Sequence, residues 1–78
     1  MKQRIKVPPL GEGVTTATIV EWGYEVGDTV VAGEVLVAVE LDKIDTDIPS
    51  PVGGTLVERH GDAGDEVEVG TVIAVVDA

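Results

Sequence analysis

The feature of this sequence that most limits its fold is an internal repeat, in which the second half of the chain matches the first at a constant offset of 37 residues. The dipeptide Gly27-Asp28 recurs as Gly64-Asp65, and Thr-Ile-Val-Glu at 18–21 recurs as Thr-Leu-Val-Glu at 55–58. Further matching pairs are Val30 with Val67, Gly33 with Gly70, Val35 with Val72, Leu36 with Ile73 and Val39 with Val76. A unit of this length cannot bury a core alone, so we expect two similar halves related by an approximate two-fold axis.

Each half has the pattern of short β-strands separated by turns. β-Branched residues are frequent, glycines that can adopt positive φ punctuate them, and helical spacing is nowhere sustained. The expected strands are Arg4–Val7, Thr15–Trp22, Thr29–Val31, Val35–Glu40, Ile44–Ile48, Gly54–His60, Glu66–Val69 and Val72–Val76. Strands of this length and spacing favour an all-β fold, a flattened barrel or barrel-sandwich hybrid of two four-stranded sheets.

With 78 residues the chain is expected to form a single domain, residues 1–78. The repeat also predicts where parts of that domain lie. At the offset of 37, Lys6 is the counterpart of Lys43. The chain should enter and leave near one end of the symmetry axis, so the segment that joins the halves, around Asp42-Lys43, should lie at the opposite end.

The charge balance restricts the class of partner. Five basic and fifteen acidic side chains give a formal net charge of −10, which disfavours nucleic acids and anionic membranes and favours a basic protein partner. Acidic surfaces also keep small domains soluble, and the charge by itself favours neither reading. The absence of Cys excludes a disulfide framework and a thiol nucleophile, and no signal peptide or apolar run long enough to span a membrane is present, so we expect an intracellular, non-secreted domain.

The segment between the two halves predicts an exposed hairpin. The apolar run Val35–Glu40 precedes it, and Ile44–Ile48, which follows it, alternates Ile or Thr with Asp. This pattern puts Asp42 and Lys43 at the tip, where Asp is a favoured turn residue. The nearby carboxylates favour the charged ammonium form of Lys43, so this lysine is a poor nucleophile and better suited to modification by another enzyme. The local sequence alone favours an ordinary solvated lysine.

Three motifs support a more specific interpretation of this hairpin. Glu40-Leu41-Asp42-Lys43-Ile44 resembles the Asp-Lys-(Ala/Val) hairpin tip at which lipoyl domains are modified. The stretch Val7–Gly13 resembles the opening of that family, and Ile48–Gly54 resembles the segment after its lipoyl-lysine strand. In order and spacing the chain is similar to the N-terminal lipoyl domain of a dihydrolipoamide acyltransferase, the E2 component of a 2-oxo acid dehydrogenase complex. Leu41 stands where the family commonly has Thr, and Ile44 where it has the smaller Ala or Val.

The resemblance implies a carrier function rather than catalysis. Lys43 would carry lipoic acid in amide linkage, attached by a lipoate ligase or lipoyl transferase. The partners would then be the thiamin-dependent decarboxylase E1, the E2 catalytic domain with coenzyme A, and the flavin-dependent dihydrolipoamide dehydrogenase E3. The isolated domain would be monomeric, and it would form the N-terminal part of a longer E2 chain in the bacterial cytoplasm or the mitochondrial matrix. Partner recognition is expected around the lysine and in the loop after the first strand, at Glu40, Leu41, Asp42, Ile44, Gly11 and Glu12.

Other kinds of site have little support. Asp45-Thr46-Asp47 begins like a calcium loop, but Pro49 and Ser50 break the pattern, and His60 is the only His. No catalytic or metal-binding residue is therefore predicted. Trp22 and Tyr24 match Arg59 and Gly61 across the repeat, and this asymmetry suggests that the two aromatic side chains cover an edge of the core.

The remaining alternatives share the hairpin fold. A biotinyl carrier would typically have Met on both sides of the lysine, whereas Asp42 and Ile44 stand there. The lipoyl carrier of glycine cleavage is a longer chain with helical segments. A non-carrier, lipoyl-like interaction module would need no exposed Asp-Lys tip. The Gly11-Glu12-Gly13 opening leans towards pyruvate or branched-chain complexes rather than 2-oxoglutarate complexes.

Overall fold

The computed structural model describes residues 1–42 and 44–78. It contains the eight strands β1 (Lys2–Lys6), β2 (Thr16–Trp22), β3 (Thr29–Val30), β4 (Val35–Leu41), β5 (Ile44–Pro49), β6 (Gly54–Arg59), β7 (Glu66–Glu68) and β8 (Val72–Asp77). All eight expected strands are present, and each end lies within two residues of its predicted place. No helix among the described residues is long and apolar enough to cross a membrane.

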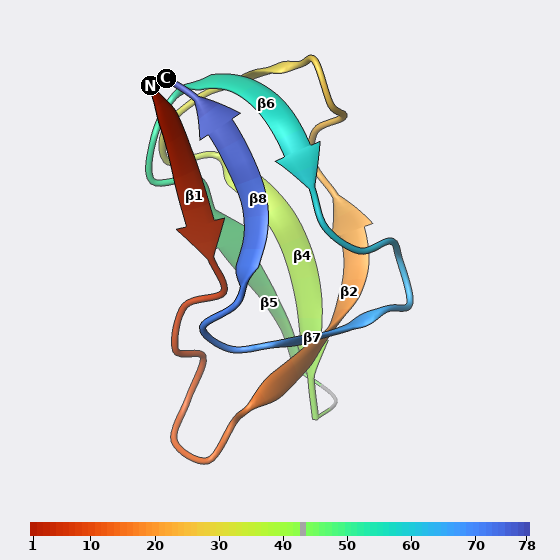
Figure 1. Ribbon diagram of the computed structural model, residues 1–78. Helices are drawn as coiled ribbons and strands as arrows, with labels where there is room; N and C mark the ends of the chain where they lie inside the picture. The colour runs from red at the N-terminus through yellow and green to blue at the C-terminus, as the bar shows by residue number, and fades with distance from the viewer. Residues whose placement is uncertain (43) are drawn as a thin grey trace.

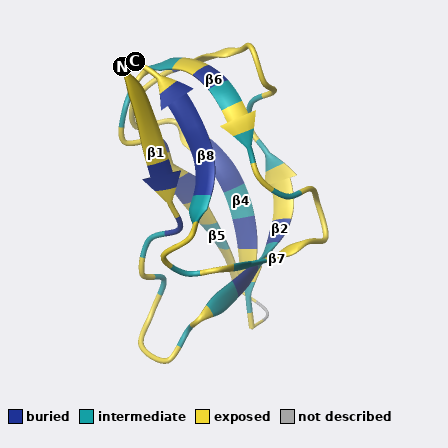
Figure 2. Ribbon diagram, in the orientation of Figure 1, coloured by how far each residue is buried: buried dark blue, intermediate teal, exposed yellow. Residues whose placement is uncertain are grey.

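The strands form two antiparallel four-stranded sheets that face each other (Figure 1). Their orders are β1-β8-β6-β3 and β5-β4-β2-β7, which confirms the predicted all-β architecture. The core between them consists mainly of Ile, Leu and Val side chains from both sheets, among them Ile19, Leu36, Val39, Leu56 and Ile73. Figure 2 shows that the inner strand β8 is almost wholly buried, whereas the edge strand β1 is largely exposed.

The two halves are related by an approximate two-fold axis, and equivalent residues of the two halves make equivalent hydrogen bonds. The Gly27 amide donates to the Leu56 carbonyl at 2.7 Å, and its repeat counterpart, the Gly64 amide, donates to the Ile19 carbonyl at 2.7 Å. Each half therefore completes the Gly-Asp turn of the other. This reciprocity confirms the predicted symmetry and explains why neither copy forms a closed core alone.

A second pair of contacts crosses between the halves at Trp22 and Arg59, which occupy equivalent repeat positions. The Trp22 indole donates to the Gly61 carbonyl at 2.9 Å, and the Arg59 guanidinium donates to the Tyr24 carbonyl at 3.1 Å. The guanidinium carbon lies 5.7 Å from the centre of a Trp22 ring, a cation–π arrangement. Trp22 and Tyr24 pack against the core, as the sequence predicts.

One sequence-based equivalence is wrong. Lys6 pairs with Val72 between β1 and β8. The repeat counterpart of Val72 is Val35, and Val35 pairs with Pro49 between β4 and β5. Lys6 is therefore equivalent to Pro49 and not to Lys43, which itself lies outside the described residues. The offset changes because the connection from β1 to β2, residues 7–15, is longer than the connection from β5 to β6, residues 50–53.

The corrected equivalence explains where the hairpin lies. Met1 and Ala78 exchange two backbone hydrogen bonds of 2.9 Å. By the two-fold symmetry, this pair is equivalent to the pair of Ile44 and Leu41 at the end of the β4–β5 stem. The two-fold axis thus relates the chain termini to the β4–β5 turn. In a molecule 33 Å long they lie at opposite ends, as predicted (Figure 1).

Candidate functional site at the β4–β5 turn

The β4–β5 hairpin is paired up to its last possible residues. Glu40 lies opposite Asp45 and Leu41 opposite Ile44, so only positions 42 and 43 connect the strands. Further down the stem, Val37 and Val39 are fully buried in the core. The turn is therefore carried by two strands anchored in the core, and the sequence places Lys43 between Asp42 and Ile44.

Asp42 adopts the left-handed conformation, with a φ of 39°, and no other described non-glycine residue has a positive φ. Two-residue hairpin turns require such angles because their twist then matches that of the strands. Asp tolerates this region better than most side chains, since its carboxylate can interact with nearby backbone donors. The residue before Lys43 is thus constrained by the turn, independently of any partner that reads it.

Substitutions of Asp42 should separate its conformational role from its charge. We expect Asp42→Val to destabilise the domain by about 1–2 kcal/mol, because β-branched residues fit the left-handed region poorly, and Asp42→Gly to leave stability nearly unchanged. Chemical denaturation followed by circular dichroism measures both. Both variants lose the same charge, so equal destabilisation would show that the carboxylate, rather than the backbone angle, stabilises the turn.

The loop between β1 and β2 lies beside this turn. Glu12, Gly13 and Val14 line a groove together with Leu41 and Asp42. Gly11 does not line the groove, but its carbonyl accepts a hydrogen bond from the Val14 amide at 3.2 Å and so shapes the loop. The structure therefore brings Glu12 together with two of the residues flanking Lys43, although about thirty positions separate them in the sequence.

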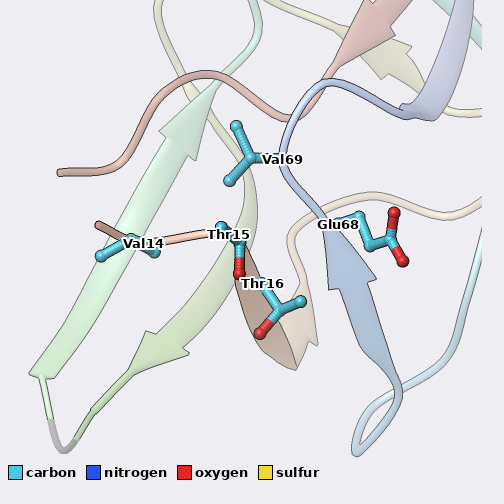
Figure 3. Close-up of a pocket in the computed structure, with 5 residues that line it drawn as sticks. All are labelled: Val14, Thr15, Thr16, Glu68 and Val69. Atoms are coloured by element: carbon cyan, nitrogen blue, oxygen red, sulfur yellow. The ribbon is translucent and has the colours of Figure 1, made fainter. Parts of the chain in front are cut away.

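The groove continues onto β7, which the sequence analysis does not include in the site. Val14, Thr15 and Thr16 also line a second hollow whose other wall is Glu68 and Val69 (Figure 3). Glu68 arrives there because it pairs with Thr16 across the β2–β7 ladder. No local motif marks Glu68, since its place depends on long-range strand register.

The surface around the turn is acidic, and the two apolar side chains that flank the turn, Leu41 and Ile44, differ in exposure. Glu40, Asp42, Asp45 and Asp47 are all exposed, and Glu40 and Asp45 lie directly opposite each other, an arrangement of like charges that costs stability. Ile44 is 67% exposed, whereas Leu41 packs partly against the core. No three His, Cys, Asp or Glu side chains within residues 1–42 and 44–78 form a metal-binding group.

Comparison with known sequences identifies the same family over almost the whole chain. Residues 3–76 match the family described as "Biotin-requiring enzyme". The acetyltransferase component of the pyruvate dehydrogenase complex of Corynebacterium glutamicum is 54% identical over 70 residues, which are 90% of this chain and 10% of that protein. The succinyltransferase component of the 2-oxoglutarate dehydrogenase complex of Bartonella vinsonii is 44% identical over 78 residues, covering 100% of this chain and 19% of that protein.

Solved structures show the same fold. The lipoyl domain of the 2-oxoglutarate dehydrogenase complex from Azotobacter vinelandii superposes with a TM-score of 0.76 at 25% identity, covering 96% of this chain and 95% of that one. A region of Kluyveromyces lactis urea carboxylase has a TM-score of 0.82 at 22% identity, a likeness of fold alone, over 99% of this chain and 6% of that one. The chain spans only about a tenth of the length of the Corynebacterium acetyltransferase component and about a fifth of that of the Bartonella succinyltransferase component. It belongs to the biotin/lipoyl attachment family and is a lipoyl domain of the type found in the E2 acyltransferases of 2-oxo acid dehydrogenase complexes.

Proposed function

We propose that this domain is a carrier whose Lys43 accepts lipoic acid in amide linkage. The main observation in support is the β4–β5 turn, in which strand pairing up to Leu41 and Ile44 leaves only Asp42 and Lys43 as connection. Asp42 and Ile44, the neighbours of Lys43, are both exposed, which suits access by a ligase, and the surrounding carboxylates suit a lysine that is acted upon. The family match supports a group of this kind at a hairpin lysine.

The chemistry comes from the attached group and from separate enzymes. A lipoyl group on Lys43 would supply a disulfide that can be reduced and acylated, and a dithiol that can be reoxidised once the acyl group has passed to coenzyme A. The decarboxylase E1, the E2 catalytic domain and the dehydrogenase E3 would supply the catalysis for these reactions. The domain's residues hold the attachment point on a core-anchored hairpin and present it at the end opposite both termini. Tethering through those termini to the rest of a longer acyltransferase gives the group a high effective concentration at each partner.

Recognition is proposed to involve both the hairpin and the β1–β2 loop. Glu40, Leu41, Asp42 and Ile44 flank the lysine, while Glu12 lies across the groove and Gly11 shapes the loop that holds it. Amide formation removes one positive charge, so the tip becomes more acidic and better suited to basic partner surfaces. The relatives act in pyruvate and 2-oxoglutarate dehydrogenase complexes, so we assign the substrate only to the class of 2-oxo acids.

Intact-mass analysis after co-expression with a lipoate ligase tests the attachment. We expect a gain of one lipoyl group in the native chain and in Lys6→Ala, whose exposed lysine lies on β1, and no gain in Lys43→Ala. Circular dichroism should show the same fold in all three. A gain that persists in Lys43→Ala would refute the assignment, and capture of the native chain on avidin would identify a biotinyl carrier instead.

A further inference from the structure

The basic residues of this acidic chain are concentrated on one strand. Lys2, Arg4 and Lys6 are three of the five Lys and Arg residues, and they occupy alternate positions of β1, so their side chains project from one face. All three are exposed. Elsewhere among residues 1–42 and 44–78 the only Lys or Arg is Arg59, whose guanidinium is held by Trp22 and the Tyr24 carbonyl.

β1 also has a free side for pairing. It is the outermost strand of its sheet, and among the strands of residues 1–42 and 44–78 it pairs only with β8, so the backbone groups on its other side face no strand of the described chain. Next to it runs an apolar groove lined by Ile5 and Ile48, by Pro49 and Pro51, and by Arg4 and Lys6. An extended chain lying here would meet backbone donors and acceptors, an apolar surface and a row of cations together.

The sign of this charge is specific to β1. The equivalent edge strand of the other sheet is β5, and the two-fold relation places Asp45 and Asp47 where β1 has Lys2 and Arg4. Charged residues on an edge strand prevent edge-to-edge aggregation, and carboxylates do this at β5. Protection of the edge explains a charge at β1 but not its sign. Lys2 lies opposite Asp77 of β8, whereas Arg4 and Lys6 lie opposite Val75 and Val72, so no carboxylate of β8 accounts for the positive charge of these two.

We propose that β1 and its groove bind an extended acidic segment of a partner protein, which adds to the sheet as a strand alongside β1. Alternate side chains of that segment would be carboxylates facing Lys2, Arg4 and Lys6, and apolar residues would enter the groove over Ile5 and Ile48. A second copy of this chain is a poor occupant because two chains of net charge −10 repel each other. Screening over about 8 Å at physiological salt lets a narrow strand respond to the basic row rather than to the acidic remainder.

A direct test uses a fluorescein-labelled peptide in which Glu and Val alternate, titrated with the domain at physiological salt and followed by fluorescence anisotropy. We expect the double variant Arg4→Gln/Lys6→Gln to bind about tenfold more weakly than the native domain. The matched control is Val26→Glu/Val31→Glu, which changes the net charge by the same amount at exposed positions flanking β3, the opposite edge of the sheet. This control should bind nearly as well as the native domain.

Amide chemical shifts recorded in the same titration locate the peptide. Shifts concentrated in β1 and at Ile48–Pro51 support the proposal. Equal weakening by both double variants, shifts centred elsewhere, equal binding of a Lys–Val peptide, or no binding at millimolar peptide would each overturn it. Shifts in β1 that depend on domain concentration without peptide would identify a second copy as the occupant and also overturn it.

Discussion

Gly54→Ala is expected to unfold the domain or bring it close to unfolding. Gly54 has a φ of 151°, which side-chain-bearing residues rarely adopt, and a Cβ there would overlap the Asp77 carbonyl oxygen and lie 2.8 Å from the Ala78 Cα. The residue also pairs with Val30 at the start of β6, so it cannot move without disturbing β3. Strain and overlap together should cost about 3–5 kcal/mol, against a total stability of about 4–12 kcal/mol for a chain of this size.

The control for this prediction is Gly70→Ala. Gly70 has a φ of 91°, but nothing lies within 4 Å of the position a Cβ would take, so only the conformational cost of about 1–2 kcal/mol should appear. Urea denaturation followed by circular dichroism and by Trp22 fluorescence measures both variants. If Gly54→Ala is no less stable than Gly70→Ala, then the close approach of Asp77 and Ala78 to β6 is not what requires glycine at position 54.

The second large effect is expected at the paired core residues Leu56 and Ile19, which are 0% and 1% exposed. Each lies at an equivalent place in its half, with its carbonyl bound by the Gly-Asp turn of the other half. Leu56→Ala and Ile19→Ala should each destabilise the domain by about 2–5 kcal/mol, through lost burial and the cavity that remains. Because the two sites are related by symmetry, the two losses of unfolding free energy should agree within about 1 kcal/mol. Substitutions of this kind at unrelated core sites differ by more than that.

Val26→Ala is the control for this pair, since Val26 is 57% exposed and its truncation should change stability by less than about 0.5 kcal/mol. Thermal and urea unfolding give the free energies of all three variants. A large inequality between Leu56→Ala and Ile19→Ala would mean that one half dominates the core and that the symmetry of the backbone does not extend to its energetics.

These stability effects bear on the carrier function because the hairpin has no core of its own. Its stem depends on Val37 and Val39, which lie in the same core as Ile19 and Leu56. Loss of that core should therefore disorder the β4–β5 turn and lower lipoylation at Lys43, although neither substituted side chain is near the turn. Asp42→Gly, which leaves the core intact, provides the comparison for a purely local change.

Much of the fold was predictable because it follows from local information. The alternation of Ile and Val with polar residues, the Gly-Asp turns and the 37-residue repeat predict eight strands, two sheets and the place of the hairpin opposite the termini. The strands and turns depend on side-chain periodicity and turn chemistry, which act over a few residues, whereas the place of the hairpin follows from the symmetry that the repeat implies. The attachment residue, Lys43, was selected by its motif and lies outside the described residues, so its role stays a prediction.

Only the tertiary structure decided which distant residues meet. The equivalence of Lys6 and Lys43 failed because connections of unequal length shift the register of β1, and a constant offset cannot detect this. Glu68 joins the groove beside Thr16 through strand pairing, and Trp22 finds the Gly61 carbonyl across the symmetry axis. The basic row on β1 is visible in the sequence, but its position at a free edge beside an apolar groove is not. Strand neighbours and register are set by packing of the whole core, so they are determined only when both halves have come together.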